Sequence, residues 1–332
     1  MTEATAVSIR FHTTNPELTD FYREVIDGLT RRPRSIPPKY FYDVEGSRLF
    51  EAICKQPEYY PTRTEMALLE QYAGEIAALI GPGCYLIEPG SGSCEKVRLL
   101  LDLIEPQAYV PLDISCEHLK TAANRIARKF PGLDVHAVCT DITDSLSLPF
   151  IPANAQRVIF YPGSSIGNFD PCEAERFLED LARIAGLGGG LLIGVDLKKH
   201  PERLNAAYND ASGVTAAFNL NLLHRINREL GADLDVSSFD HYAFYNKDEG
   251  RIEMHLVSSS AQSFHVDGHH FELEAGDNIH TENSYKYTIQ EFQALAIRAG
   301  FATGAVWTDP ERLFSVHYLR VQDVKRRHPA LV

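Results

Sequence analysis

The residues best suited to chemistry in this 332-residue chain surround a glycine-rich turn. A short apolar run at 85–87 leads to Glu88, and Gly90 and Gly92 follow directly. A strand that turns sharply into a helix directs backbone N–H groups outward, and glycines allow that backbone to approach a ligand closely. Glu88, placed just before the turn, can pair with a cationic amino group. The segment therefore predicts a ligand-binding turn.

Two features of this turn favour S-adenosylmethionine as the ligand. The methionine part of that cofactor carries an ammonium group, which suits Glu88. A turn that binds a nicotinamide dinucleotide more often has a third glycine, and Glu95 stands at that position here. The alternative, a strand-to-helix turn that binds no ligand, stays open on this segment alone.

Two aspartates follow the next two predicted strands. Asp113 ends the strand at 109–112 and stands twenty-one residues after Gly92. A carboxylate there typically accepts from both ribose hydroxyls, in S-adenosylmethionine and in a nicotinamide dinucleotide alike. Asp141 comes after the strand at 134–138 and can accept from an adenine amino group. Either aspartate can instead cap a helix or stabilise a turn.

A polar loop at 163–168 follows the predicted strand at 157–161. In a parallel sheet, the loops at the carboxyl ends of the strands face the ligand cleft. Gly163 permits close approach of a substrate, and the Asn168 side chain offers both a donor and an acceptor. An ordinary Gly/Asn turn is an equally good interpretation of this loop alone.

The segment at 281–287 alternates in the manner of a strand, which places Glu282 and Ser284 on one face. Such a pair can bind a polar ring that carries two nitrogen atoms. The solvent face of a strand is the alternative, and this segment by itself favours that alternative.

The elements that would position these residues alternate between strand and helix, which is typical of a parallel α/β sheet. A Ser/Thr-x-x-Glu pattern at Thr62–Glu65 predicts a capping box that opens the first helix. The patterns predict strands at 85–87, 109–112, 134–138, 157–161 and 190–196, with helices at 62–79, 95–104, 117–129 and 173–184.

After residue 198 this alternation stops. A largely helical stretch at 201–229 precedes alternating segments that predict antiparallel strands, and a helix and a strand pair close the chain. We therefore expect an α/β fold, a Rossmann-like sheet with a second, discontinuous α+β domain that binds the substrate. The expected boundaries are 61–198 plus 287–332 for the sheet and 1–60 plus 199–286 for the second domain. The strands of the later part are expected at 242–245, 251–258, 263–266, 270–273, 305–308 and 314–320, with helices at 47–55 and 290–300.

Composition limits the classes of function. A net charge of −13 argues against a general nucleic-acid binder. No apolar run is long enough to cross a membrane, and the N-terminal residues lack the basic start and apolar run of a secretory signal. Six cysteines without CxxC pairing indicate reduced thiols in the cytoplasm. Thirteen histidines occur without HExxH or Cys/His ligand spacing, so we expect no metal.

Taken together, these segments resemble the L-histidine Nα-methyltransferases of ergothioneine biosynthesis. The Pro-Glu-Tyr-Tyr-Pro-Thr-Arg string that begins at Pro57 and the Gly-Ser-x-Ile-Gly-Asn loop are far more specific than a general methyltransferase turn. The matching pieces span nearly the whole chain: 41–43, 46–50, 57–65, 88–102, 111–113, 163–168, 251–254 and 281–286.

The resemblance implies that a Rossmann-like frame binds S-adenosylmethionine. It also implies three successive methylations of the histidine α-amino group, which give hercynine and S-adenosylhomocysteine in the first step of the pathway. The implied cofactor contacts are Tyr42, Gly90, Lys96, Asp113 and Asp141, to which the turn itself adds Glu88 and Gly92. The implied substrate contacts are Tyr59, Gly163, Asn168, Tyr208, Met254, Glu282 and Ser284.

Within that set, the resemblance assigns Asn168 and Tyr208 to the amino and carboxylate end of the substrate, and Glu282 and Ser284 to the imidazole. We hypothesise that Asn168 and Tyr59 act catalytically by orienting the amine, which must be neutral and in line with the bond to the transferred methyl group. Tyr60 is the alternative to Tyr59, and the spacing from Tyr42 favours Tyr59.

The chain departs from the family pattern at Asn283, where an aliphatic residue is usual, and at Cys94, where a small hydroxylated residue is usual. Asn283 leaves open a methyltransferase of the same frame that acts on another amino acid or small amine. A nicotinamide-dependent oxidoreductase and a non-catalytic binding module are further alternatives. The chain lacks the sulfur-inserting domain that some relatives carry, so a separate downstream enzyme is expected. We also expect a monomer that binds neither nucleic acid nor membrane.

Overall fold

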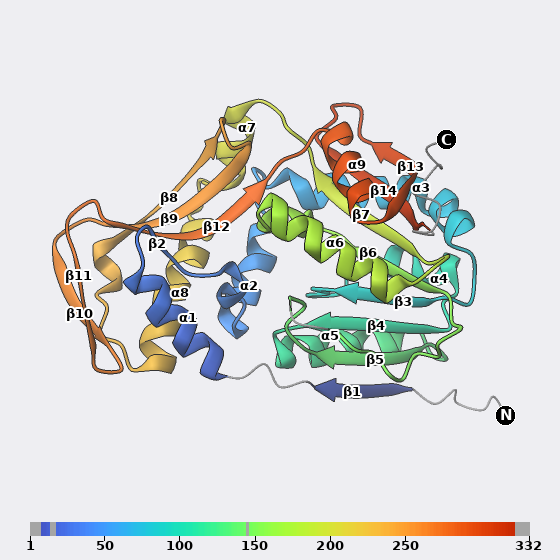
Figure 1. Cartoon of the computed structure of the whole chain (residues 1–332), viewed down its shortest axis with the longest axis horizontal. Helices are drawn as coiled ribbons and strands as arrows, with labels where there is room; N and C mark the ends of the chain where they lie inside the picture. Colours follow the sequence, from blue (N-terminus) through green and yellow to red (C-terminus); the bar gives the residue numbers. More distant parts are fainter. Residues whose placement is uncertain (1–7, 14–17, 144–145, 323–332) are drawn as a thin grey trace, which may run out of the picture. The chain divides into compact units, whose positions relative to one another are not determined.

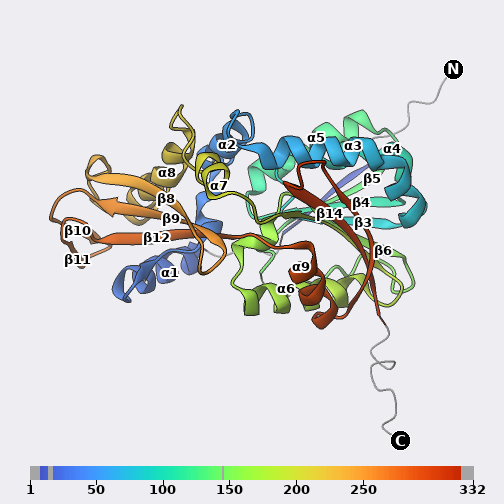
Figure 2. The same cartoon turned by 90° about the horizontal axis from the view of Figure 1, so that it is seen from above.

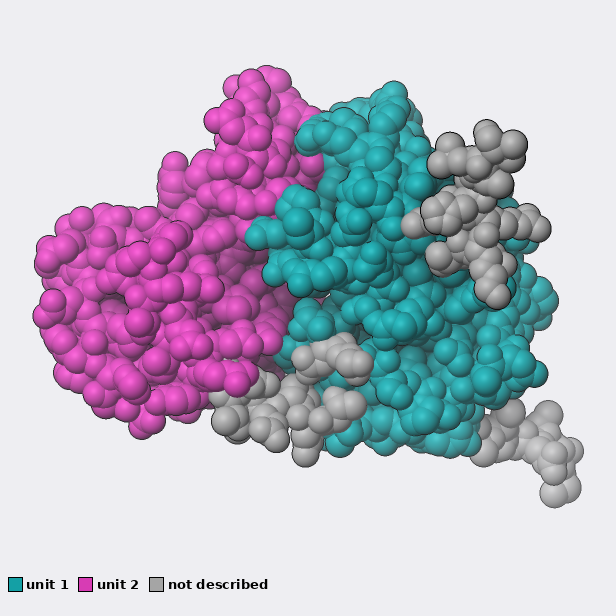
Figure 3. Space-filling view, viewed as in Figure 1, with its two compact units in different colours: residues 1–15, 61–198, 287–332 teal, residues 16–60, 199–286 magenta. Residues whose placement is uncertain are grey.

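The computed structural model describes residues 8–13, 18–143 and 146–322 of the chain. It divides into two compact units, which Figure 3 colours separately. Unit 1 consists of residues 1–15, 61–198 and 287–332, and unit 2 of residues 16–60 and 199–286. The N-terminal residues in which we found no secretory signal lie outside the described part of the chain. No helix among the described residues is long and apolar enough to cross a membrane.

Unit 1 contains an eight-stranded sheet in the order β1-β5-β4-β3-β6-β7-β14-β13 (Figure 1). The strands from β1 to β7 in this order are parallel, whereas β14 and β13 are antiparallel to their neighbours. This confirms the expected Rossmann-like α/β sheet. The strands are β1 (Ile9–Thr13), β3 (Tyr85–Pro89), β4 (Ala108–Asp113), β5 (Asp134–Cys139), β6 (Arg157–Tyr161), β7 (Gly190–Asp196), β13 (Phe301–Thr308) and β14 (Phe314–Val321).

Helices cover both faces of this sheet. Figure 2 shows α3, α4 and α5 on one face and α6 and α9 on the other. The connections from β3 to β4, from β4 to β5 and from β6 to β7 run through α4, α5 and α6, as is usual between parallel strands. Their bounds are α3 (Tyr60–Ile80), α4 (Leu101–Ile104), α5 (Cys116–Lys129), α6 (Pro171–Ala185) and α9 (Ile289–Arg298), with short 3₁₀ helices η2 (Val97–Leu99) and η3 (Ser165–Asn168).

The order of the strands creates a switch point beside β3. The chain runs from β3 through β4 to β5 on one side and returns to β3 on its other side as β6. In open α/β sheets, ligands bind outside the carboxyl ends of the strands at such a point. Glu88 lies near the end of β3, Asp113 ends β4, and the loop at 163–168 follows β6. The fold therefore brings three of the predicted segments to one edge of the sheet.

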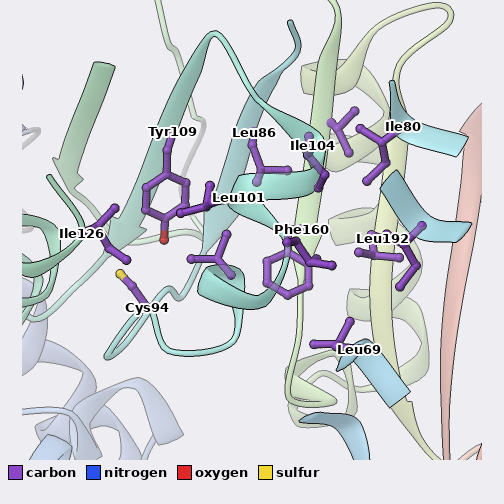
Figure 4. Packing of buried hydrophobic residues seen from close by; sticks show 14 of the residues in the cluster. Leu69, Ile80, Leu86, Cys94, Leu101, Ile104, Tyr109, Ile126, Phe160 and Leu192 are labelled. Carbon is purple, nitrogen blue, oxygen red and sulfur yellow. The ribbon is translucent and has the colours of Figure 1, made fainter. Parts of the chain in front are cut away.

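A hydrophobic core lies between the sheet and the helices α3 to α5 (Figure 4). Leu86, Tyr109, Phe160 and Leu192 come from four adjacent strands, and each is almost fully buried. The strands are apolar on both faces because helices cover both, which explains their continuous rather than alternating hydrophobic runs. Burial of one such side chain contributes about 1.5–3 kcal/mol, so this packing fixes the strand ends that carry the polar residues.

Unit 2 is built on a four-stranded sheet in the order β2-β12-β9-β8, with a separate two-stranded hairpin, β10–β11. β12 is antiparallel to β9 and β9 to β8. Helix α8 packs against β8 and β9. The elements are β2 (Arg34–Ser35), β8 (Phe239–Asn246), β9 (Arg251–Ser258), β10 (Gln262–Val266), β11 (His269–Leu273), β12 (Asn278–Tyr285), α1 (Leu18–Thr30), α2 (Val44–Ile53), α7 (Pro201–Ala207), α8 (Val214–Leu230), η1 (Pro38–Phe41) and η4 (Val236–Ser238).

A β-bulge in β12 decides which side chains share a face of this sheet. His280 pairs with His255, but Glu282 pairs with Met254, so Thr281 is the extra residue. The Thr281 hydroxyl donates to the Asn219 Oδ1 at 2.8 Å, which holds the bulge. Because paired residues in an antiparallel sheet point to the same side, Glu282 faces the opposite side from His280.

One expectation for the N-terminal part was wrong, and one helix there was not predicted. Residues 1–60 were assigned as a whole to the second domain, but β1 pairs in parallel with β5 at the edge of the sheet of unit 1. The helix α1 was missed as well. β1 is a short edge strand that is only partly buried, so its sequence Ile-Arg-Phe-His-Thr lacks the apolar run by which the inner strands were found.

The helix expected at 95–104 is also not continuous. The chain forms a turn, the 3₁₀ helix η2 and the single-turn α4, so no long helix dipole points at the glycine turn. The helical stretch at 201–229 is divided into α7 and α8, and the Asp210 carboxylate accepts from the Val214 and Thr215 N–H groups at the start of α8. These carboxylate contacts explain the break.

The capping box predicted at Thr62–Glu65 does not form. α3 already begins at Tyr60, and Glu65 directs its carboxylate to Lys96 and Gly163. The expectation of six reduced cysteines was wrong too, because Cys116 and Cys139 form a disulfide with Cα atoms 5.2 Å apart. The other four cysteines, at positions 54, 84, 94 and 172, lie outside this disulfide.

Candidate active site

Glu88 is a buried carboxyl at the end of β3, only 1% exposed. The Tyr109 hydroxyl donates a hydrogen bond to it. Burial raises the pKa of Glu88 to about 8, although this hydrogen bond and the Lys96 ammonium oppose the shift. A cationic group that comes close to a buried acid strongly stabilises the ionised form of that acid. Glu88 therefore fits the ammonium group of S-adenosylmethionine.

The glycine turn that follows adopts a backbone that few other residues tolerate. Gly90 and Gly92 have positive φ angles of 64° and 50°, and Cys94 has a φ of 56°. The Asp113 carboxylate accepts from the Gly92 N–H at 2.8 Å and from the Ser115 N–H at 2.9 Å. Asp113 thus ties the turn to the end of β4. Each carboxylate oxygen keeps a further lone pair, so both can still accept a hydrogen bond. The contact of Asp113 with the ribose stays a prediction.

Asp141 has the local role that we considered as its alternative. One of its carboxylate oxygens accepts from the Thr143 N–H at 2.9 Å and from the Thr143 hydroxyl at 2.6 Å. The residue is buried beside the end of β5, and the Thr140 N–H donates to the Asp113 carbonyl. The two aspartates are thus joined through the backbone at neighbouring strand ends. The contact of Asp141 with adenine stays a prediction.

Glu65 is a functional candidate that the sequence did not reveal. Its carboxylate is 1% exposed, lies 2.6 Å from the Lys96 ammonium and accepts the Gly163 N–H at 2.9 Å. A Cβ atom on Gly194 would lie 2.0 Å from the Glu65 Oε1, so only glycine leaves room for this carboxylate. Two signals for this contact were present in the sequence. One is an acid on the buried stripe of α3, and the other is a glycine inside the apolar strand β7.

The loop at 163–168 continues from this contact. Gly163 and Ser164 have positive φ angles of 87° and 60°, and the Ser164 hydroxyl accepts from the Asp196 N–H at 2.8 Å. The loop then forms η3, which ends at the half-buried Asn168. Unit 1 therefore holds Glu88, Gly90, Gly92, Lys96, Asp113, Asp141, Gly163 and Asn168 of the predicted set.

In unit 2, three polar side chains form a buried hydrogen-bonded group. The Tyr208 hydroxyl donates to the Ser284 Oγ at 2.8 Å. The Lys286 ammonium, which is 2% exposed, donates to that Oγ at 2.8 Å and to the Tyr208 hydroxyl at 3.1 Å. Lys286 was not among the predicted site residues, although it lies in the segment 281–286 that carries the family resemblance. A lysine two positions after Ser284, on the same face of the expected strand, was the available signal.

Glu282 and Met254 lie on the same face of the sheet as Ser284. Glu282 pairs with Met254, and Ser284 pairs with Ile252, as the bulge requires. Burial raises the pKa of Glu282 to about 7, and the charge of Lys286 opposes the shift. Asn283 pairs with Glu253 on the opposite face. Its departure from the family pattern is therefore on the side away from Glu282.

The two adjacent tyrosines, Tyr59 and Tyr60, have different surroundings. The Tyr59 ring lies edge-on to that of Tyr208 with centroids 6.3 Å apart, and burial raises its pKa well above 10.0. The Tyr60 hydroxyl instead accepts from the Lys199 ammonium at 2.6 Å. Tyr59, not Tyr60, therefore belongs to the group around Tyr208. Tyr42, predicted as a cofactor contact, lies in unit 2 against Phe50 and Phe218.

A parallel sheet with an acid-and-glycine turn at its switch point defines an α/β protein that binds a nucleoside cofactor. The sequence comparisons narrow this class. A model of the family described as histidine-specific, S-adenosylmethionine-dependent methyltransferases matches residues 21–321, so the chain belongs to this family. The expected cofactor and the expected enzyme class are confirmed by this membership.

The chain is similar to three relatives whose printed names differ in substrate or pathway. The histidine N-alpha-methyltransferase of Mycolicibacterium smegmatis is 42% identical over 87% of this chain and 91% of its own length. Ergothioneine biosynthesis protein 1 of Neurospora crassa is 32% identical over 91% of this chain, which spans 34% of that protein. The 4-dimethylallyltryptophan N-methyltransferase of Claviceps purpurea is 28% identical over 86% of this chain and 90% of its own length.

Proposed function

We propose that this enzyme transfers methyl groups from S-adenosylmethionine to the α-amino nitrogen of L-histidine, three times in succession, to give hercynine. This reaction is the first step of ergothioneine biosynthesis. Membership of the histidine-specific family and the 42% identity to a histidine N-alpha-methyltransferase support the substrate.

The observation that carries the proposal is the hydrogen-bonding character of Ser284. Its Oγ accepts from both Tyr208 and Lys286, which uses its two lone pairs. Its own O–H is then available to a further acceptor. Glu282, on the same face, offers an acceptor oxygen. One donor and one acceptor on one face match the neutral imidazole ring, which has one acceptor nitrogen and one N–H.

This pairing also gives a physical basis for selectivity. An indole or phenyl side chain cannot accept the Ser284 proton, so a buried polar group would stay without a partner. A site built in this way rejects analogues that lack the matching group more strongly than an apolar pocket rejects a difference in size. The donor and the acceptor on this face favour histidine over the apolar aromatic substrate named for the Claviceps relative. Methylation of another amino acid is the alternative that the substrate test must exclude.

The residues of unit 1 then have positioning roles. When bound, S-adenosylmethionine supplies an activated sulfonium methyl group. Glu88 binds the cofactor ammonium, and the glycine turn held by Asp113 lets the cofactor approach the backbone closely. Asn168 orients the substrate amine through its amide. Tyr59 stays a neutral phenol at neutral pH because its pKa is raised, so it takes part as a hydrogen-bonding group and not as a phenolate base.

The test of the imidazole assignment compares L-histidine with its two ring-N-methylated isomers. Initial rates of S-adenosylhomocysteine release should fall for both isomers, because each blocks one of the two nitrogen contacts. Equal kcat/KM values for histidine and either isomer would contradict the assignment.

Three further expectations from the sequence are part of the proposal. We propose that the enzyme acts in the cytoplasm as a monomer and that a separate enzyme takes its product onward. Light scattering of the purified protein tests the monomer, and a dimeric mass would contradict it.

A further inference from the structure

Unit 2 carries a second cluster of polar side chains on the opposite face of its sheet from Glu282. Glu253 and His255 stand two residues apart on β9, and His280 pairs directly with His255 from β12. The i, i+2 spacing and the cross-strand pair place all three side chains on one face. One ligand atom from each can be chosen so that all three lie within 4.8 Å of one another. The cluster takes no part in the proposed methyl transfer.

Each imidazole has one nitrogen within hydrogen-bond distance of an oxygen acceptor. The His280 Nε2 lies 3.0 Å from the Glu282 carbonyl oxygen, and the His255 Nδ1 lies 3.1 Å from the Asn278 Oδ1. Each of these nitrogens donates to its oxygen in one of the two neutral tautomers. The other nitrogen of each ring then carries a lone pair. A histidine that ligates a metal shows this arrangement, with its second N–H held by a carbonyl or carboxylate oxygen.

The carboxylate is oriented in the same manner. The Glu253 Oε1 accepts from the Asn246 amide and from the Arg251 Nε, each at 2.9 Å. Its Oε2 faces the His255 Nε2 at 3.2 Å. This contact is a hydrogen bond when the His255 Nε2 carries the proton. In the other tautomer both atoms offer lone pairs that one cation can share.

One of the three distances between ligand atoms already has the length that a small transition-metal ion requires. Zinc bonds of about 2.0–2.2 Å to nitrogen and oxygen in tetrahedral geometry place neighbouring ligand atoms roughly 3.3 Å apart. The Glu253–His255 contact of 3.2 Å already has this length. Two imidazoles and one carboxylate form a donor set that zinc and related divalent ions prefer. Glu253 is buried, and His255 and His280 are half-buried, so the three residues supply three of the four ligands that a tetrahedral ion takes.

We propose that Glu253, His255 and His280 form a binding site for a divalent transition-metal ion of the zinc class. The ion joins β9 to β12 next to the bulge. Its ligand His280 donates to the backbone carbonyl of Glu282, so the bound ion holds the strand segment that carries Glu282. Its role is structural. No local sequence pattern indicates this site, because only the pairing of two strands brings His280 to the other two residues.

The test uses the full chain without a histidine tag, from which bound metal is first removed with a chelator. Zn²⁺ is then titrated into the protein in the presence of a chromogenic chelator that competes for the ion. We expect one equivalent bound with a Kd of about 10 µM or lower. His280→Asn and Glu253→Gln should each weaken binding by about tenfold or more. The control is His270→Asn, which breaks the cross-strand His265–His270 pair of the hairpin β10–β11. This variant should bind zinc as the unchanged protein does.

Two results would overturn the proposal. One is the absence of stoichiometric binding below about 100 µM zinc. The other is equal affinity in the His280→Asn and Glu253→Gln variants that keep the native far-ultraviolet circular dichroism. If both variants fail to fold, X-ray absorption of the zinc-loaded unchanged protein decides. Scattering from two imidazoles supports the site, and a first shell without imidazole contradicts it.

Discussion

The carboxylate of Glu65 lies 2.6 Å from the ammonium of Lys96, and the same carboxylate accepts the Gly163 N–H. These contacts connect the start of α3, the glycine turn and the loop after β6, which are far apart in the sequence. Lys96 was predicted to contact the cofactor, and Gly163 the substrate. One buried acid therefore positions a residue of each predicted set.

Replacing this acid should affect both stability and cofactor binding. Glu65→Gln keeps an acceptor for Gly163 but removes the charge that pairs with Lys96. Because the Lys96 side chain is 19% exposed, its ammonium can turn partly to water. We therefore expect a loss of about 1–3 kcal/mol in the free energy of unfolding, below the range for fully buried pairs. Urea denaturation measures it.

The matched control for Glu65 is Glu70→Gln on the exposed face of the same helix, which should change stability by less than about 0.5 kcal/mol. S-adenosylhomocysteine should also bind more weakly to Glu65→Gln than to the control. Equal stability and equal affinity in the two variants would show that the Glu65 contacts are incidental.

The affinity for S-adenosylhomocysteine should depend on pH through Glu88. In the free protein this carboxyl has a pKa of about 8, whereas pairing with the ligand ammonium requires the ionised form. Binding below that pKa must therefore release a proton. The dissociation constant should fall by about tenfold per pH unit from pH ~6 to pH ~8 and then level off. Calorimetry in buffers of different ionisation enthalpy measures both the slope and the proton.

Glu88→Gln is the control for this pH dependence. The amide keeps the size and an acceptor for the Tyr109 hydroxyl but cannot ionise. Its affinity should be lower at pH ~8 and nearly independent of pH in the same interval. A slope as steep in this variant as in the unchanged protein would assign the proton to another group.

Ser284→Ala should weaken histidine binding without weakening cofactor binding. The substitution removes the hydroxyl proton that we assign to the imidazole and leaves the Lys286 and Tyr208 groups with one partner fewer. Loss of such a buried contact costs about 1–3 kcal/mol, or roughly 5- to 150-fold in the dissociation constant. Calorimetry with the S-adenosylhomocysteine complex measures it. Ser263→Ala, at an exposed position of β10, is the control, and an equal effect there would refute the assignment.

Glu282→Ala should reduce histidine affinity by about tenfold or more, because the ring N–H would lose its buried acceptor. Glu282→Gln, which keeps an acceptor oxygen, should lose less. The exposed Glu274→Ala variant serves as the control. If the dissociation constant for histidine were unchanged in Glu282→Ala, the carboxylate would have no part in binding the ring.

The turn, the parallel strands and most helices could be predicted because their signals are local. Glu88, Gly90 and Gly92 lie within five residues, and the inner strands are continuous apolar runs. Glu65 stands 31 residues from Lys96 and 98 from Gly163, so no local pattern could reveal these contacts. The Cys116–Cys139 disulfide, 23 residues apart, also depends on how the strands pair.

The face of the unit 2 sheet that carries Glu282 and Ser284 could also be predicted only in part from local patterns. Alternation correctly placed Glu282 and Ser284 on one face. Alternation would also have placed His280 there, and only the bulge at Thr281 moves it to the other side. A bulge has no reliable sequence signal, because it depends on the hydrogen bonds of the partner strand.

The central claim is that histidine is the substrate and that its α-amino nitrogen takes three methyl groups. The most direct measurement incubates the enzyme with S-adenosylmethionine and an equimolar panel of amino acids, including L-tryptophan and L-phenylalanine, and identifies the products by mass spectrometry with fragmentation. We predict that histidine alone is consumed and that it accumulates with three methyl groups, all on the α-amino nitrogen. Preferential methylation of another amino acid, or methyl groups on the imidazole ring, would contradict the account.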